Sequence, residues 1–169
     1  TATMHSVLEA MGIGVGDEVI VPSLTMSATS LAVLHANATP VFADVDIDTF
    51  NIESKSIEKN ITEKTKAIIT VALYGLSPDM DPIMNLAKKY NLLVIEDNAQ
   101  AFLSYYKNKL VGTFGDAASF SFQSSKHLSA GEGGITTTNK KERERVLKKR
   151  RYNCLLNKTT YIYDRWPNR

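Results

Sequence analysis

Apolar positions along the chain follow two spacings, one typical of helices and one typical of strands. Within residues 1–11 and 79–90 they recur every three or four positions, which predicts helices with one apolar face. Further helices are expected up to residue 35, with Ser23 or Thr25 as the N-cap, and over 52–61 and 140–151. Short β-rich or continuously apolar runs predict strands at residues 18–22, 39–45, 66–73, 92–95, 117–122 and 135–138.

Strands that alternate with helices predict an α/β fold with a mostly parallel sheet flanked by helices. The run 66–73 is almost continuously apolar, as expected for a strand buried on both faces at the centre of such a sheet. Ligands of these folds bind at the carboxyl ends of the strands. Asp97 and Ser121 fall at or near such ends, and Lys126 follows shortly after, so these three are the candidate site residues.

Composition adds limits on the partners. The 169 residues are 43% hydrophobic and 22% charged, with a net charge of +2, which suits one sizeable core and gives no strong field for nucleic acid or membrane. Glu142 and Glu144 interrupt the basic run of the helix expected at 140–151, which favours a solvated surface helix over a nucleic-acid patch. No apolar run approaches the roughly 18 residues of a membrane span. We expect neither a nucleic-acid nor a membrane partner.

The cysteine content and the two chain ends bear on location and completeness. Cys154 is the only cysteine, so no disulfide can form within the chain, which fits a reducing cytoplasm. The chain begins at Thr1 and runs directly into a helical pattern, and it stops at Arg169 without an obvious terminating element. We therefore expect a cytoplasmic protein of which this chain is one piece.

Two patterns resemble ligand-binding motifs but have simpler interpretations. The glycine-rich stretch 12–16 follows a predicted helix and precedes a strand, the reverse of the order in a dinucleotide-binding loop. Asp44, Asp46 and Asp48 have the alternation of calcium ligands, but they lack the loop glycine and the terminal glutamate. We interpret both stretches as turns.

Asp97 follows an apolar strand, so its carboxylate is expected near the core and must have a partner. An arginine, a metal or a ligand cation would serve, and the absence of a nearby His/Cys cluster argues against zinc. The protonated pyridine nitrogen of pyridoxal phosphate (PLP) would also suit, with Lys126 supplying an amine for the aldehyde of PLP. Ser121 and the N–H groups of the first helix could hold the phosphate. Taken alone, Lys126 is expected to be a solvated loop lysine, since lysine is almost never buried unpaired.

The order of motifs along residues 1–151 resembles the DegT/DnrJ/EryC1/StrS family of PLP-dependent sugar aminotransferases. The matching stretches are 12–25 (GIGVGDEVIVPSLT), 38–46 (ATPVFADVD), 61–68 (ITEKTKAI), 73–75 (LYG), 79–81 (DMD), 94–101 (VIEDNAQA), 120–122 (FSF), Lys126 and 131–134 (GEGG). The resemblance implies the large domain of the type I aminotransferase fold. It assigns 1–151 to an incomplete PLP-binding large domain and 152–169 to the start of a connection towards a missing C-terminal domain.

The resemblance also implies roles for single residues. Lys126 matches the lysine that forms a Schiff base with the cofactor, and Asp97 matches the acid on its pyridine nitrogen. Gln100 matches a residue that contacts the cofactor near its phenolic oxygen. Met26 stands where relatives usually have an aromatic residue that stacks on the ring, and a methionine can still cover a ring face. His127 follows the lysine where asparagine is common.

The phosphate of the cofactor has its own group of matching residues. Ser121 matches a phosphate ligand. Thr1 and Ala2 match the phosphate-binding end of a helix, where the N–H groups and the helix dipole favour an anion.

The activity implied by the resemblance is transamination in amino-sugar and polysaccharide biosynthesis. An amino-acid donor, typically glutamate, converts PLP to the pyridoxamine form, which then aminates a nucleotide-linked keto sugar. Lys126 acts as general base and acid, and two copies of the chain form a homodimer with shared active sites. A dehydratase-type branch that has histidine in place of the lysine is disfavoured by Lys126. A non-catalytic PLP-binding regulatory protein is disfavoured by the intact set of Asp97, Gln100, Ser121 and Lys126.

Overall fold

A computed structural model describes residues 1–139, 141, 144, 147 and 160–163. The helices are α1 (Ala2–Ala10), α2 (Ala28–His35), α3 (Ser54–Lys59) and α4 (Met80–Tyr90), with a short 3-10 helix η1 (Leu73–Gly75). The strands are β1 (Glu18–Pro22), β2 (Thr39–Ala43), β3 (Thr65–Val71), β4 (Leu93–Asp97), β5 (Tyr105–Tyr106), β6 (Lys109–Leu110), β7 (Ala117–Ser121), β8 (Gly134–Thr137) and β9 (Thr160–Tyr163).

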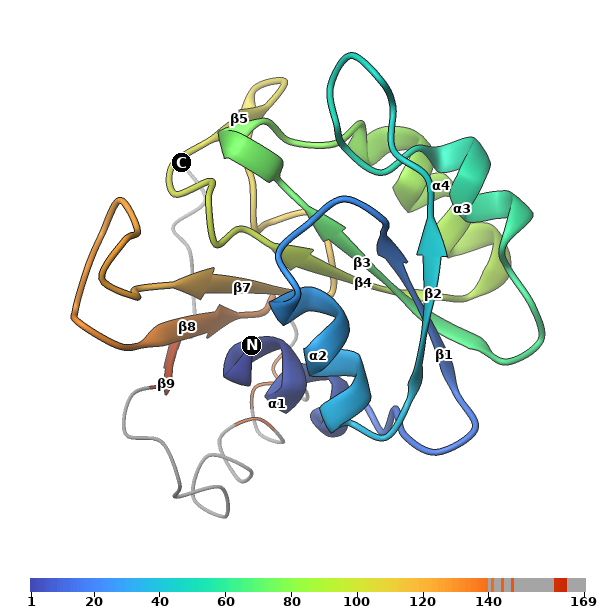
Figure 1. Ribbon diagram of the computed structural model, residues 1–169, viewed down its shortest axis with the longest axis horizontal. Coiled ribbons are helices and arrows are strands. Elements are labelled where there is room, and N and C mark those ends of the chain that lie inside the picture. The colour runs from blue at the N-terminus through green and yellow to red at the C-terminus, as the bar shows by residue number, and fades with distance from the viewer. Residues whose placement is uncertain (140, 142–143, 145–146, 148–159, 164–169) are drawn as a thin grey trace.

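The described strands form one large sheet and a separate small hairpin. The sheet has the order β2-β1-β3-β4-β7-β8-β9, and β5 pairs with β6 (Figure 1). Neighbouring strands of the sheet are parallel except β7 and β8, which are antiparallel. The α/β fold with a mostly parallel sheet is therefore confirmed.

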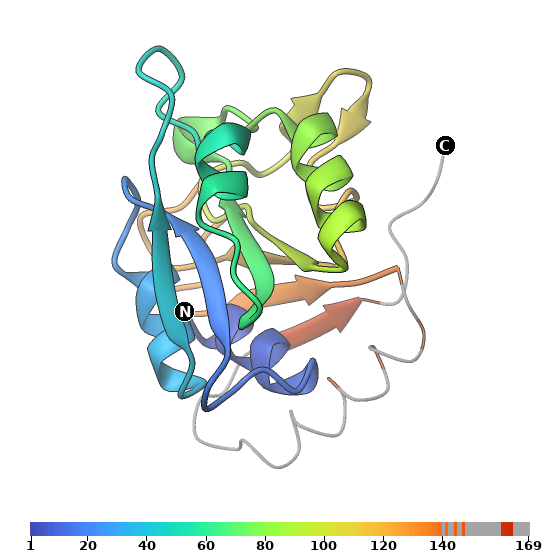
Figure 2. The ribbon, with the colours of Figure 1, turned by 90° about the vertical axis from the view of Figure 1, so that its right-hand side faces the viewer.

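Helices cover both faces of the sheet, and each face has its own apolar core. Figure 2 shows α1 and α2 on one side of the sheet and α3 and α4 on the other. On β4, Ile95 packs with residues of α1 and α2, whereas Val94 packs with residues of α3 and α4. Side chains alternate along a strand, so Asp97 lies on the α1/α2 face and Glu96 lies on the α3/α4 face.

The structure changes several boundaries expected from the sequence. The helix after β1 begins at Ala28 with Ser27 as its N-cap, so the expected cap at Ser23 or Thr25 is wrong. The strand expected at 92–95 continues to Asp97, because its last residues pair with β3 and β7. The β5–β6 hairpin was not predicted, since two-residue strands are too short to show a periodic pattern.

Part of the C-terminal expectation lies outside the described residues. Of the helix expected at 140–151, the structure describes Lys141, Glu144 and Leu147, all of which are helical. Of the connection expected at 152–169, it describes β9, which pairs with β8. The assignment of 152–169 as an interdomain connection stays a prediction.

The two stretches that resemble ligand-binding motifs, residues 12–16 and 44–48, are turns, as expected. Residues 12–16 join α1 to β1. Asp46 Oδ1 accepts hydrogen bonds from the backbone N–H groups of Asp48 and Thr49 and from the Thr49 hydroxyl, so its carboxylate closes a turn.

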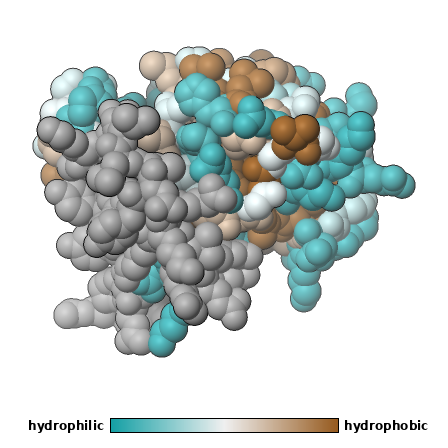
Figure 3. Space-filling model, turned by 90° about the horizontal axis from the view of Figure 1, so that it is seen from below, coloured by the Kyte–Doolittle hydropathy of each residue, from teal (hydrophilic) through white to brown (hydrophobic). Residues whose placement is uncertain are grey.

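Large apolar side chains remain exposed in the loops that leave the carboxyl ends of the parallel strands. Examples are Met26 after β1, Ile47 after β2, Tyr74 after β3 and Leu103 after β4. The view from below in Figure 3 shows that apolar patches also stand between hydrophilic side chains on another face. Among the described residues, no helix has the length and apolar character needed to cross a membrane.

Candidate active site

Asp97 ends β4 between the carboxyl ends of β3 and β7, where it pairs in register with Val71 and Ser119. Its side chain is buried, with 5% of the residue exposed. The Thr29 hydroxyl donates to Asp97 Oδ2 over 3.1 Å, and the Ala99 N–H donates to Oδ1 over 3.1 Å. Asp97 therefore has one protein donor on each oxygen, supplied by neutral groups from α2 and from its own turn.

Burial and charge act on Asp97 in opposite directions. Burial raises the pKa of the Asp97 carboxyl above its usual 3.8, because an ion loses its hydration in the interior. The Ala99 and Thr29 hydrogen bonds act to lower the pKa. The positive charge of Lys126 acts in the same direction, so its ammonium lies within electrostatic reach of the carboxylate.

Lys126 lies in the loop that joins β7 to β8. Backbone hydrogen bonds from Phe122 N to Gly133 O and from Ala130 N to Phe122 O close this loop at its base. The Lys126 N–H bonds Gln123 O over 2.9 Å, and the residue is half-buried. His127, by contrast, is exposed on the same loop. The sheet thus brings Lys126 within electrostatic reach of Asp97, which lies 29 positions earlier in the chain.

The N-terminus of α1 and the end of β7 meet at the same edge. The buried hydroxyls of Thr3 and Ser119 are hydrogen-bonded over 2.5 Å, which ties the first turn of α1 to β7. Ser121 is half-buried two positions after Ser119, so its side chain lies on the same sheet face. Thr1 and Ala2 are exposed at the start of the helix, where the N–H groups of the first turn lack intrahelical acceptors.

Gln100 and Met26 occupy the loops around this edge. Gln100 Oε1 accepts a hydrogen bond from the Tyr74 backbone N–H over 2.8 Å, which joins the loops after β3 and β4. The carbonyl oxygen is thereby used, and a donor role towards a cofactor oxygen falls to its amide nitrogen. Met26 lies in the β1–α2 loop with 67% of its surface exposed.

Taken together, the chemistry of these residues matches the functional groups of PLP. A buried carboxylate that faces a lysine suits a protonated ring nitrogen on one side and an aldehyde on the other. A helix N-terminus beside a serine hydroxyl suits a phosphate. Among the described residues, no cluster of three or more His, Cys, Asp or Glu side chains could hold a metal ion.

Sequence reasoning missed the partners of the two buried carboxylates. Glu96 is 2% exposed and accepts hydrogen bonds from the backbone N–H groups of Gly112 (2.6 Å), Phe114 (2.8 Å) and Gly115 (2.6 Å). Gly115 is required here, because a Cβ at that position would lie 2.7 Å from the Val94 carbonyl oxygen. The glycines of the 112–115 turn were the sequence signal for this close approach.

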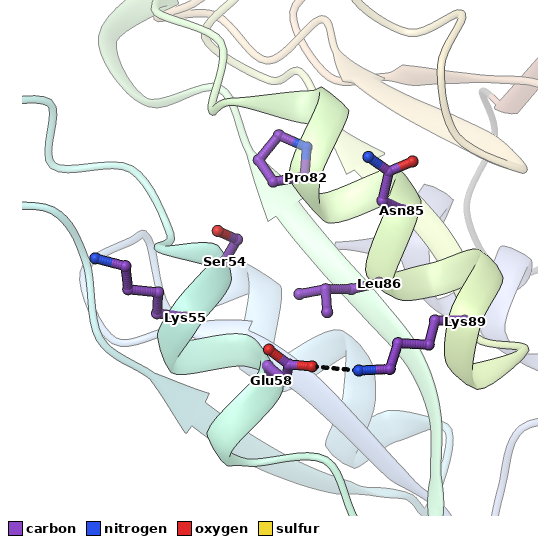
Figure 4. A pocket seen from close by; sticks show the side chains of 7 residues that line it. All are labelled: Ser54, Lys55, Glu58, Pro82, Asn85, Leu86 and Lys89. Atoms are coloured by element: carbon purple, nitrogen blue, oxygen red, sulfur yellow. Dashed lines mark hydrogen bonds and ion pairs between the residues drawn. The ribbon is translucent and has the colours of Figure 1, made fainter.

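A separate hollow lies between α3 and α4 (Figure 4). It is a shallow groove of about 270 Å³ lined by Ser54, Lys55, Glu58, Pro82, Asn85, Leu86 and Lys89. The exposed Lys89 ammonium and the Glu58 carboxylate form an ion pair of 2.8 Å across it. This groove contains none of the candidate site residues.

Comparison with known proteins identifies the family of the chain. Residues 1–164 match the DegT/DnrJ/EryC1/StrS aminotransferase family. The chain belongs to this family. Over 139 residues it is 52% identical to a GDP-perosamine synthase of Caulobacter vibrioides, an alignment that covers 82% of this chain and 38% of that protein.

Solved structures confirm the fold class, the large domain of a PLP-dependent aminotransferase. The chain superposes on DesV of S. venezuelae, solved in complex with a ketimine intermediate, with a TM-score of 0.87 and 38% identity over 93% of this chain and 43% of that one. It superposes on the PLP-form of a putative sugar aminotransferase from Streptococcus pneumoniae with a TM-score of 0.74 and 35% identity, over 80% and 38% of the two chains. The chain thus spans about two fifths of the length of the proteins it matches.

Proposed function

We propose that this chain is the PLP-binding part of a transaminase that transfers an amino group from an amino acid, with glutamate as the donor, to a nucleotide-linked keto sugar. The observation that carries the proposal is the buried Asp97 carboxylate at the carboxyl edge of the sheet, with Lys126 within electrostatic reach of it. Family membership supports the same chemistry. When bound, PLP supplies an electron-withdrawing ring and an aldehyde that accepts the amino group.

Each side chain has a defined task in this proposal. Asp97 binds the protonated ring nitrogen and keeps it charged. Because Asp97 is buried, the attraction between its carboxylate and that nitrogen is stronger than it would be in water. Ser121 and the N–H groups of Thr1 and Ala2 at α1 hold the phosphate. The Lys126 amine, once free of the cofactor, would move a proton between the substrate carbon and the cofactor carbon as general base and acid.

The position of Lys126 has a direct chemical test. The full-length protein mixed with PLP should show a yellow absorption band, and reduction with borohydride followed by peptide mapping should find the cofactor on Lys126. Lys126→Ala should abolish the band, whereas Lys109→Ala, which removes an exposed lysine of β6, should leave it intact. A map with the cofactor on another lysine would overturn the assignment.

The substrate class rests on the relatives. A relative that is 52% identical is named GDP-perosamine synthase, which supports a nucleotide-linked sugar as acceptor and a role in amino-sugar and polysaccharide biosynthesis. The test is to incubate the full-length protein with glutamate and a panel of nucleotide-linked keto sugars and to read the products by mass. An amino sugar supports the proposal, whereas a deoxysugar would assign the protein to the dehydratase-type branch.

We also propose that the full-length protein is a homodimer whose partner covers the site edge. Support comes from the exposed apolar side chains in the loops after β1, β2, β3 and β4, since such surface is usually buried against another body. Sedimentation of the full-length protein should give a mass of two chains, and a monomer would contradict this. We further propose that the large domain ends near residue 151, which rests on the family resemblance. A cytoplasmic location is proposed because Cys154 is the only cysteine.

A further inference from the structure

Thr29 is the side chain that connects α2 to the candidate site. It is fully buried in the first turn of this helix, and its hydroxyl donates to Asp97 Oδ2 over 3.1 Å. Its oxygen also lies 3.3 Å from the Thr25 hydroxyl, one turn earlier in the chain. The two hydroxyls form a short chain that leads from the β1–α2 loop to the carboxylate.

The hydrogen bonds of Asp97 leave room for one more charged partner. Oδ1 accepts from the Ala99 N–H, and Oδ2 accepts from Thr29. Each carboxylate oxygen has two acceptor positions, so one donor on each oxygen fixes the plane of the group without exhausting its capacity. The Ala99 donor is backbone and belongs to the same turn, so Thr29 is the only one of the two that a side-chain substitution can remove.

Among the described side chains, the charged group that acts on Asp97 is Lys126, from the β7–β8 loop. Thr29 is the neutral group on the remaining element, α2. A donor to an ionised carboxylate favours the ionised form, whereas a buried carboxylate without donors binds a proton more readily. Thr29 therefore affects both the orientation and the ionisation of Asp97.

We propose that Thr29 is a positioning residue, whose hydroxyl holds Asp97 in the orientation and charge state that bind the ring nitrogen of the cofactor. This inference rests on the proposed PLP-binding function. Thr29 does not itself need to touch the cofactor, because it acts through Asp97. The same contact couples the β1–α2 loop, which carries Met26, to the acid at the centre of the site.

The test uses pyridoxamine phosphate, which has an amine in place of the aldehyde and cannot form a Schiff base with Lys126. Its dissociation constant is measured between pH 5 and 8 on the full-length protein by absorbance or fluorescence titration. Thr29→Val keeps the shape of the side chain and removes the donor, and Thr29→Ser keeps the donor. Thr29→Ala removes the donor without adding a methyl group and serves where the valine variant does not fold.

Removal of the donor should weaken binding at neutral pH by about tenfold, the usual loss for a hydrogen bond to a charged group. The pH below which binding fails should also move up by about one unit, because Asp97 then binds a proton more readily. Thr29→Ser should stay within about threefold of the wild type at every pH. An unchanged pH profile in both the valine and the alanine variants would overturn the proposal.

Thr65→Val is the matched control. Thr65 is a buried threonine at the amino end of β3, the opposite edge of the sheet, and its hydroxyl accepts from the Thr62 N–H over 2.9 Å. Its loss should lower the melting temperature and leave the pH profile of binding unchanged, whereas a shifted profile would mean that any lost hydroxyl has this effect and would count against Thr29. A wild-type protein that binds neither PLP nor pyridoxamine phosphate would contradict the proposed function itself, before any variant is compared.

Discussion

Glu96 and Asp97 are adjacent buried carboxylates at the end of β4, on opposite faces of the sheet, and their surroundings differ. Glu96 accepts three backbone N–H groups from the turn at 112–115. Asp97 has one donor on each oxygen and lies within electrostatic reach of the positive charge of Lys126. The same strand end thus carries one carboxylate whose acceptor positions are largely filled by the fold and one that retains capacity for a cation.

The comparison distinguishes a buried carboxylate that supports the fold, Glu96, from one that is available to bind a cofactor, Asp97. A buried carboxylate costs free energy unless hydrogen bonds compensate it, and backbone donors compensate Glu96 while they fix the turn between β6 and β7. Asp97 is less fully compensated, so the ring nitrogen of a cofactor would complete its surroundings. We therefore expect substitutions of Glu96 to act on stability and substitutions of Asp97 to act on cofactor binding and activity.

The largest expected effect is that of Asp97→Asn on activity. The variant cannot stabilise a protonated ring nitrogen, so kcat/KM of the full-length enzyme should fall on the order of a hundredfold to a thousandfold, as for other preorganised electrostatic partners. Steady-state kinetics with glutamate and the accepted keto sugar measure it. A loss of less than about threefold in kcat/KM would contradict the proposal that Asp97 acts on the cofactor.

The next effect is that of Glu96→Ala on stability. Three backbone N–H groups would lose their acceptor inside the protein, which should lower the free energy of unfolding by roughly 3 kcal/mol or more. Glu96→Gln keeps one carbonyl oxygen and should cost about 1 to 3 kcal/mol. Urea unfolding measures both, and kcat/KM of the folded Glu96→Gln protein should stay near the wild-type value. Unchanged stability in both variants would mean that the turn does not depend on this carboxylate.

A smaller effect concerns the pH dependence of stability without cofactor. Burial raises the pKa of Asp97, so the folded protein holds this proton to a higher pH than the unfolded chain, and stability is lost as pH rises from 3.8 through the raised pKa. Cofactor-free Asp97→Asn should therefore melt higher than the wild type at neutral pH, and the difference should shrink as pH falls. Thermal melts between pH 4 and 8 measure it, and the opposite trend would show that Asp97 stabilises the empty site.

The smallest effect is expected in the α3/α4 groove. Glu58 pairs with Lys89 there, but both side chains are exposed to water, which screens the pair (Figure 4). Glu58→Gln should leave the free energy of unfolding indistinguishable from that of the wild type by urea titration. A clear loss would mean that surface charge at this groove matters as much as the buried carboxylates.

Most of the fold could be predicted from apolar spacing. The long elements were found because a helix with one apolar face and a strand buried on both faces have different periods, as residues 79–90 and 66–73 show. The β5–β6 hairpin was missed because its strands are too short to show a period. The start of α2 was misplaced because Ser23, Thr25 and Ser27 are all good capping residues, and local sequence does not choose among them.

For the site, the sequence by itself selected Asp97, Ser121 and Lys126, because polar residues that follow apolar strands mark the edge of a parallel sheet. It left the partner of Asp97 open among an arginine, a metal and a ligand cation. Only the tertiary structure decided that Thr29, 68 residues earlier, and the Ala99 N–H hold the carboxylate, and that Glu96 is bound by a separate turn. Such contacts depend on the order of the strands and on how α2 packs against the sheet, and neither is encoded in the local spacing of apolar residues.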